Sequence, residues 1–173
     1  YAKGNDDDVD RVLTDLGKEQ AEATGRRLKE LIDAEKIPEI EKLYYSTMIR
    51  ATQTANAMKP FLPPLDKPGQ YQPCSMIREG APIPPVPSIS KEAWNVSEID
   101  FHRDGTRIEA AFRSHIHRSD KDKDKDNDSK TNTNTSTVLV CHGNVIRYIV
   151  CRALQLNPEA WLRFSVANSS ITI

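Results

Sequence analysis

The stretch TVLVCHGN, residues 137–144, indicates the fold of this chain. Its first five residues are apolar or β-branched, a pattern typical of a strand that is buried on both faces. His142, Gly143 and Asn144 then end the strand, and residues 145–155 carry apolar side chains at helical spacing. The sequence therefore predicts a strand that leads directly into a helix, with His142 at the junction.

The residues before this stretch repeat the alternation of strand and helix. Residues 14–35 have the periodicity of an amphipathic helix, and Thr14 is suited to cap its first turn. A short strand is predicted at residues 40–46 (IEKLYYS), followed by a helix that Pro60 stops. Arg50 is therefore expected in the first turn of a helix that follows a strand.

Shorter patterns fill the rest of the chain. Residues 74–78 predict a brief strand, and the proline-rich residues 82–87 can form neither a helix nor a central strand. A third helix is predicted at residues 105–118, with Asp104 as its N-cap. The chain is expected to end on a strand that begins near Ser169.

The alternation predicts an α/β domain in three layers, α/β/α, around a mostly parallel sheet. Residues 1–173 are expected to form this single domain, incomplete at both ends, with the first and last strands truncated. Residues 119–136 (SDKDKDKDNDSKTNTNTS) contain no apolar side chain, so burial cannot offset the entropy lost on ordering them. We expect a disordered insertion there.

Composition excludes several classes of partner. The 24 basic and 25 acidic residues give a net charge of −1, so no overall field favours nucleic acid. No stretch approaches the roughly 18 apolar residues of a membrane helix, and we expect no membrane contact by this segment. The three cysteines form no CxxC pair, which favours a reducing compartment over a disulfide framework.

Three polar side chains follow the ends of predicted strands. Arg50 lies just past one strand, Glu79 just past another, and His142 at the tip of a third. Taken singly, each has an ordinary structural explanation, as a surface arginine, a loop glutamate and a capping histidine. Because the carboxyl ends of parallel strands meet at one edge of a sheet, however, we expect the three to converge there on a ligand.

Several motifs resemble the phosphoglycerate mutase (histidine phosphatase) family, and in particular its mitochondrial serine/threonine protein phosphatases. The matching segments are LTDLG (13–17), STMIRA (46–51), REGAP (78–82), RIEAAFR (107–113), CHGNVIR (141–147) and YIVCRAL (148–154). The resemblance covers nearly all of the chain outside residues 119–136. It implies a phosphatase that acts on phosphorylated proteins through a phosphohistidine, without metal or other cofactor.

The resemblance also implies a role for each of the three side chains. Glu79 is the general acid, Arg50 binds the phosphate, and His142 is the second histidine, which binds phosphate and assists catalysis. The family's nucleophile stands in an Arg-His-Gly motif that residues 1–173 do not contain. We expect that motif before Tyr1, and we expect the segment alone to be inactive.

Expectations about partners and location follow from the same resemblance. It implies phosphorylated protein substrates, a homo-oligomer, and a mitochondrial location with a membrane anchor upstream of this segment. The cytoplasm is the alternative location. His115 and His117 lie two residues apart on a predicted helix and point about 200° apart, so they cannot share a metal ion.

Two other functions remain open at this point. Cys141 and Arg147 have the spacing of cysteine-dependent protein phosphatases, but bulky Val145 and Ile146 stand where such a phosphate loop needs small residues. The other alternative is a phosphopeptide-binding scaffold, in which Arg50 and His142 bind phosphate without catalysis. The presence of the Arg-His-Gly histidine distinguishes the enzyme from the scaffold.

Overall fold

The computed structural model describes residues 10–116 and 134–173. Most of the expected insertion at residues 119–136 falls outside the described residues. Its last residue does not belong to it, because Ser136 begins a strand and pairs with Ile40. The predicted boundary is therefore wrong at that end.

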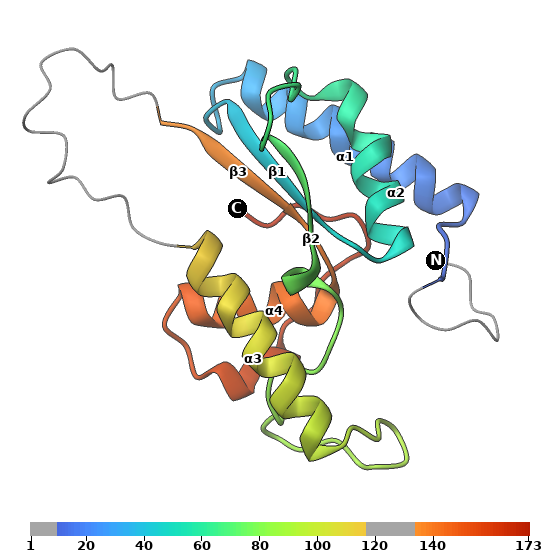
Figure 1. Cartoon of the computed structure of the whole chain (residues 1–173), viewed down its shortest axis with the longest axis vertical. Coiled ribbons are helices and arrows are strands. Elements are labelled where there is room, and N and C mark those ends of the chain that lie inside the picture. Colours follow the sequence, from blue (N-terminus) through green and yellow to red (C-terminus); the bar gives the residue numbers. More distant parts are fainter. Residues whose placement is uncertain (1–9, 117–133) are drawn as a thin grey trace, which may run out of the picture.

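Helices and strands alternate along the chain (Figure 1). In chain order they are α1 (Asp15–Asp33), β1 (Ile40–Ser46), α2 (Ile49–Met58), β2 (Tyr71–Cys74), α3 (Glu98–His115), β3 (Ser136–Val140) and α4 (Gly143–Ala153). Short 3-10 helices occupy Lys59–Phe61, Ser75–Ile77 and Pro158–Arg163. Thr14 caps α1 as predicted, since its side chain accepts a hydrogen bond from the Gly17 amide at 3.1 Å.

The described strands form one parallel sheet in the order β2-β1-β3. The strand predicted at residues 74–78 lies a few residues earlier in the chain. β2 ends at Cys74, and a 3-10 helix follows it. Pro73 within the run argues against a strand, yet β2 tolerates it at the edge of the described sheet. The α/β class with a parallel sheet is confirmed.

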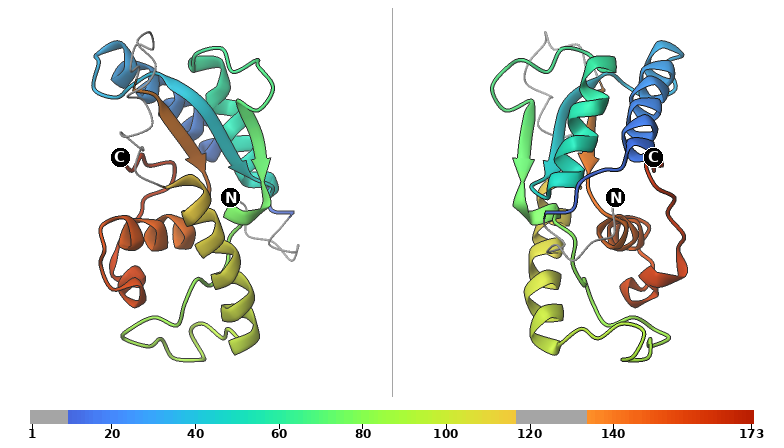
Figure 2. Two further views of the ribbon diagram at one scale, coloured as in Figure 1. Left: turned by 60° about the vertical axis from the view of Figure 1, so that its left-hand side comes forward. Right: turned by 90° about the vertical axis from the view of Figure 1, so that its right-hand side faces the viewer.

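Side chains along β1 alternate between two hydrophobic clusters on opposite faces of the sheet. Leu43 and Tyr45 belong to a cluster with α1 and α2, whereas Tyr44 packs against a cluster formed largely by α3 and α4. Figure 2 shows α1 and α2 side by side over the sheet. Helices α3 and α4 lie toward the carboxyl ends of the strands (Figure 1).

Two further predictions are corrected. Helix α3 begins at Glu98 after the N-cap Ser97, so Asp104 lies inside it rather than at its start. Gly105 suggests a helix start but lies within α3, where a side chain is excluded because a Cβ would overlap the Pro82 carbonyl oxygen. Residues 169–173 form no strand in the described structure, since Ser169 has φ = 52°, outside the extended region, and its carbonyl accepts from Thr24 Oγ1.

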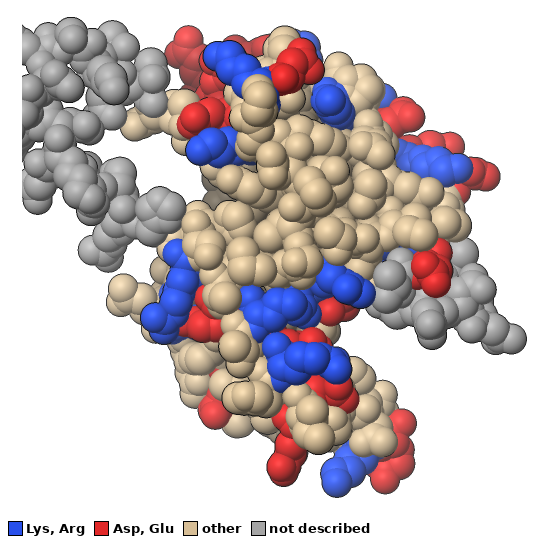
Figure 3. All heavy atoms as spheres, viewed as in Figure 1, with Lys and Arg blue, Asp and Glu red and all other residues tan. Residues whose placement is uncertain are grey.

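The surface carries charges of both signs. Figure 3 shows Lys and Arg together with Asp and Glu above and below an uncharged area in the upper half of one face. Within residues 10–116 and 134–173, no helix combines the length and the apolar character that crossing a bilayer requires.

Candidate active site

Two strands lead into helices at the same edge of the sheet. β1 passes into α2 through the N-cap Met48, and β3 passes into α4 through the N-cap His142. Neither N-cap side chain accepts a hydrogen bond from its own helix. Because a helix N-terminus carries partial positive charge, two such termini at one edge favour an anion between them.

His142 is fixed by the strand beside it. Its Nε2 lies 2.7 Å from the Ser46 hydroxyl, and both residues are buried. The Met48 amide also donates to the Ser46 hydroxyl, at 3.3 Å. Ser46 therefore joins the two strand ends. Sequence reasoning gave it no role, although it is the first residue of the quoted STMIRA segment.

The Arg50 side chain and the Glu79 backbone amide both contact the sulfur of Met48. The Arg50 Nη2 lies 3.7 Å from that sulfur, and the Glu79 amide donates to it at 3.4 Å. Arg50 is only 6% exposed, so its charge is largely shielded from solvent. The Gly80 amide donates to Glu79 Oε1 at 3.1 Å, which orients the carboxylate.

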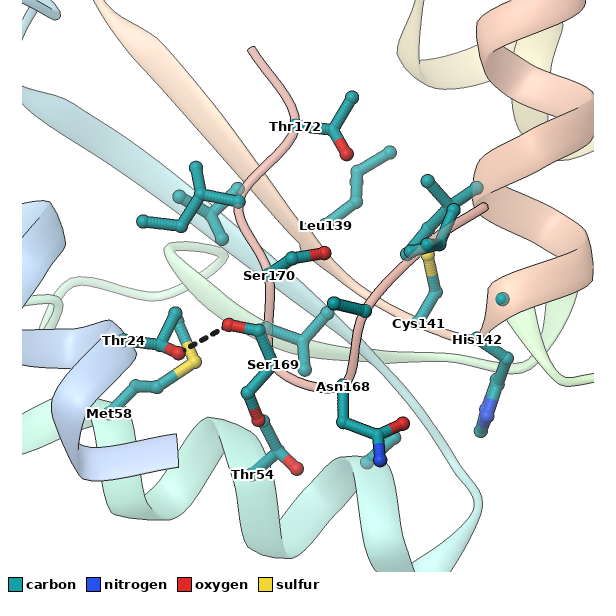
Figure 4. Close-up of a pocket in the computed structure, with 18 of the residues that line it drawn as sticks. Thr24, Thr54, Met58, Leu139, Cys141, His142, Asn168, Ser169, Ser170 and Thr172 are labelled. Atoms are coloured by element: carbon teal, nitrogen blue, oxygen red, sulfur yellow. Dashed lines mark hydrogen bonds between the residues drawn. The ribbon is translucent and has the colours of Figure 1, made fainter. Parts of the chain in front are cut away.

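All three residues expected at strand ends line one cavity of about 550 Å³. Thr14 and Gly17, at the start of α1, line it as well. The cavity continues along β3 to the C-terminal residues 166–173, and Figure 4 shows this part with His142 at its margin. A buried arginine, a histidine and a carboxyl group around one space can bind a phosphoryl group and give a proton to the oxygen that leaves it.

The surroundings of Cys141 disfavour a role as nucleophile. Although the residue keeps some exposed surface, burial of its thiol raises the pKa to about 12, so the thiol stays protonated at neutral pH. In Figure 4 the side chains of Cys141 and His142 point in different directions. Arg147, its partner in the cysteine motif, donates to Asn144 Oδ1 at 3.2 Å.

The structure also bears on metal binding. Within the described residues, no group of three or more His, Cys, Asp or Glu side chains could hold a metal ion. His115 packs instead against the Tyr44 ring, with centroids 4.5 Å apart, and its Nε2 lies 3.6 Å from the Cys74 sulfur.

Comparison with known proteins identifies the class. Residues 3–68 and 92–173 match the model of the histidine phosphatase superfamily (branch 1), and the chain belongs to this superfamily. The resemblance inferred from the sequence motifs is therefore confirmed.

Curated relatives narrow the similarity to one kind of member. The mitochondrial serine/threonine-protein phosphatase PGAM5 of Xenopus laevis is 44% identical over 165 residues, which are 95% of this chain and 53% of the relative. The human PGAM5 is 44% identical over 163 residues, 94% of this chain and 50% of its own length. The chain thus spans about half the length of the curated relatives it matches.

Solved structures agree on the fold. The phosphoglycerate mutase of Plasmodium falciparum aligns with a TM-score of 0.56 and 27% identity, over 87% of this chain and 69% of that protein. An open-reading-frame product of Mycobacterium tuberculosis aligns with a TM-score of 0.58 and 20% identity, over 92% and 75%. The latter similarity concerns the fold alone.

Proposed function

We propose that this chain is the greater part of the catalytic domain of a protein serine/threonine phosphatase that works through a phosphohistidine, without a metal ion. The observation that carries the proposal is the convergence of Arg50, Glu79 and His142 on one cavity. The relatives named as serine/threonine-protein phosphatases support the choice of substrate class.

Each side chain has a role that its surroundings support. The Arg50 guanidinium offers a planar fork of donors to two phosphoryl oxygens. His142, when protonated, places a second positive charge where negative charge develops in the transition state. Glu79 donates its proton to the departing seryl or threonyl oxygen and then takes a proton from the water that cleaves the phosphohistidine.

The nucleophile is proposed to come from outside residues 1–173, which contain no Arg-His-Gly. β3 is an edge strand of the described sheet, and the cavity runs along it. A further strand pairing parallel to β3 would end at the same edge as His142. We propose that such a strand carries the histidine, and that residues 1–173 alone have little activity.

Location and partners are part of the same proposal. Relatives named mitochondrial support a mitochondrial phosphatase whose substrates are phosphorylated proteins. A membrane anchor outside this segment and a homo-oligomeric assembly remain predictions.

The test uses the full-length protein and a phosphoserine peptide in the presence of EDTA. We expect phosphate release to continue in EDTA, and we expect a protein-bound phosphoryl group that is lost in acid but stable in alkali, as phosphohistidine is. Peptide binding without phosphate release would indicate the scaffold function. Loss of turnover in EDTA would contradict the metal-independent mechanism.

A further inference from the structure

Glu79 stands in a loop whose position must come from elsewhere in the molecule. Residues 78–82 lie outside helices and strands, between a 3-10 helix and the proline-rich segment. A general acid acts only when its carboxyl group is within hydrogen-bonding reach of the leaving oxygen. The contacts that hold this loop therefore affect the reaction as directly as the carboxylate does.

Arg107 of α3 donates hydrogen bonds to backbone carbonyl groups in and just before the Glu79 loop. Its Nη1 donates to the carbonyl oxygens of Met76 at 2.9 Å and Arg78 at 2.7 Å. Its Nη2 donates to the carbonyl oxygen of Glu79 itself, at 3.2 Å. One guanidinium thus contacts three carbonyl groups leading up to and including the proposed acid.

Asp104, one turn earlier in α3, holds the other side of the same loop. Its Oδ2 accepts from the Ala81 amide at 3.2 Å, and its Oδ1 lies 3.4 Å from Arg107 Nη2. The side chains of Asp104 and Arg107 are 14% and 22% exposed, so solvent screens this pair only partly. Glu79 is therefore bracketed by a charged pair on one helix.

The packing around Gly80 leaves the loop little freedom. A Cβ at Gly80 would come within 2.5 Å of Asp104 Oδ2 and 2.7 Å of Arg107 Nη2. From the other side, the Asn144 side-chain amide donates to the Gly80 carbonyl oxygen at 3.3 Å. Asn144 lies in the first turn of α4, two residues after His142, so the loop is tied to the histidine as well.

We propose that Arg107 is a positioning residue that sets the placement of the Glu79 carboxyl group, with Asp104 as its partner. This inference rests on the proposed role of Glu79. The planar fork of arginine suits the three carbonyl groups, whereas the compact ammonium group of lysine cannot span them in the same geometry. Loss of the fork lets the carboxyl group move, and a misplacement of about 1 Å costs up to ~10²-fold in rate.

The test is a comparison of leaving groups in the full-length protein. For each variant, kcat/KM is measured on a phosphoserine peptide, whose alkoxide needs a proton, and on p-nitrophenyl phosphate, whose phenolate leaves without one. The ratio of the two values is the readout, because any unfolded fraction of a variant cancels from it. The variants are Arg107→Met, Arg107→Lys, Glu79→Gln as the reference, and Arg113→Met as the control. Arg113 is an arginine of the same helix that pairs with Glu109 at the surface.

We expect the ratio to fall by ~10²-fold in Glu79→Gln and by at least ~10-fold in both Arg107 variants, since general acid catalysis contributes about 10²–10⁴-fold. Arg113→Met should keep the wild-type ratio. A wild-type ratio in both Arg107 variants, beside a reduced ratio in Glu79→Gln, would overturn the positioning role and leave the proposed function intact. A wild-type ratio in Glu79→Gln would remove the acid role of Glu79, and the positioning role with it.

Discussion

The helices on the two sides of the sheet are packed by different kinds of interaction. On the side of α1 and α2, the core consists of apolar side chains such as Leu28, Leu43 and Met58. On the side of α3 and α4, an apolar cluster is accompanied by a polar network centred on Glu109. That carboxylate accepts from the Tyr148 hydroxyl at 2.9 Å and from Arg152 Nε at 3.0 Å and Nη2 at 2.9 Å, and so joins α3 to α4.

The difference between apolar packing and a polar network predicts different effects of mutations on stability and on function. Apolar packing tolerates many side chains of similar volume, whereas a polar network requires particular donors and acceptors. Glu79 and His142 both depend on the second side, because α3 holds the Glu79 loop and His142 is the N-cap residue of α4. We therefore expect changes in the apolar core of the first side to alter stability, and changes in the contacts of the Glu79 loop on the second side to alter chemistry.

The largest effect on stability is expected for Leu43→Ala, which removes a fully buried side chain from the central strand. The loss should be about 2–5 kcal/mol of unfolding free energy, as for other buried leucines. Urea denaturation measures it. The ratio of peptide to aryl phosphate hydrolysis should stay at its wild-type value; a large change in that ratio would break the distinction between the two sides.

The same distinction explains which elements could be predicted from the sequence. Helix α1 and strand β1 follow an apolar period, and both were predicted within about two residues of their ends. Helix α3 begins seven residues before its predicted start, because Asp104 and Gly105 resemble a helix boundary whereas Ser97 is the actual N-cap. Only the packing of Gly105 against Pro82 accounts for a glycine there.

The site could be predicted in part. Arg50 and His142 follow the ends of β1 and β3, which the topology of a parallel sheet brings together. Glu79 lies farther from the end of β2, beyond a 3-10 helix, so the strand order alone does not place it. The residues that support them could not be found this way. Ser46 is 96 positions from His142, and Arg107 is 28 positions from Glu79, so their hydrogen bonds leave no local pattern in the sequence.

A smaller effect is expected for the Glu109 network as pH falls. Burial tends to raise the pKa of Glu109, but hydrogen bonds from Arg152, Arg113 and Tyr148 outweigh it and lower the pKa from 4.5 to about 2. A lowered carboxylate pKa stabilises the fold above pH 4.5, and that contribution disappears as pH falls toward 2. The Tm difference between wild type and Glu109→Gln should therefore be constant near neutral pH and shrink below about pH 4.5. A difference that grows on acidification would contradict this assignment.

The smallest effect is expected for the hydrophilic segment between α3 and β3. Replacement of residues 119–133 by a short Gly/Ser linker should leave Tm and activity close to wild type, because that segment contains no apolar side chain. The linker must stop before Ser136, which pairs with Ile40. A fall in Tm of many degrees would show that the segment contributes to one of the two sides.

The most direct test of the account compares two neighbouring residues in the full-length protein, with turnover of a phosphoserine peptide as the measurement. His142→Ala should lower kcat/KM by on the order of 10²–10³, the loss of one preorganised charge in the site. Cys141→Ser should cost little, because burial raises the pKa of the thiol to about 12 and the proposed mechanism gives it no role. If Cys141→Ser abolishes turnover while His142→Ala is mild, the cysteine mechanism is right and the histidine phosphatase mechanism proposed for this chain is wrong.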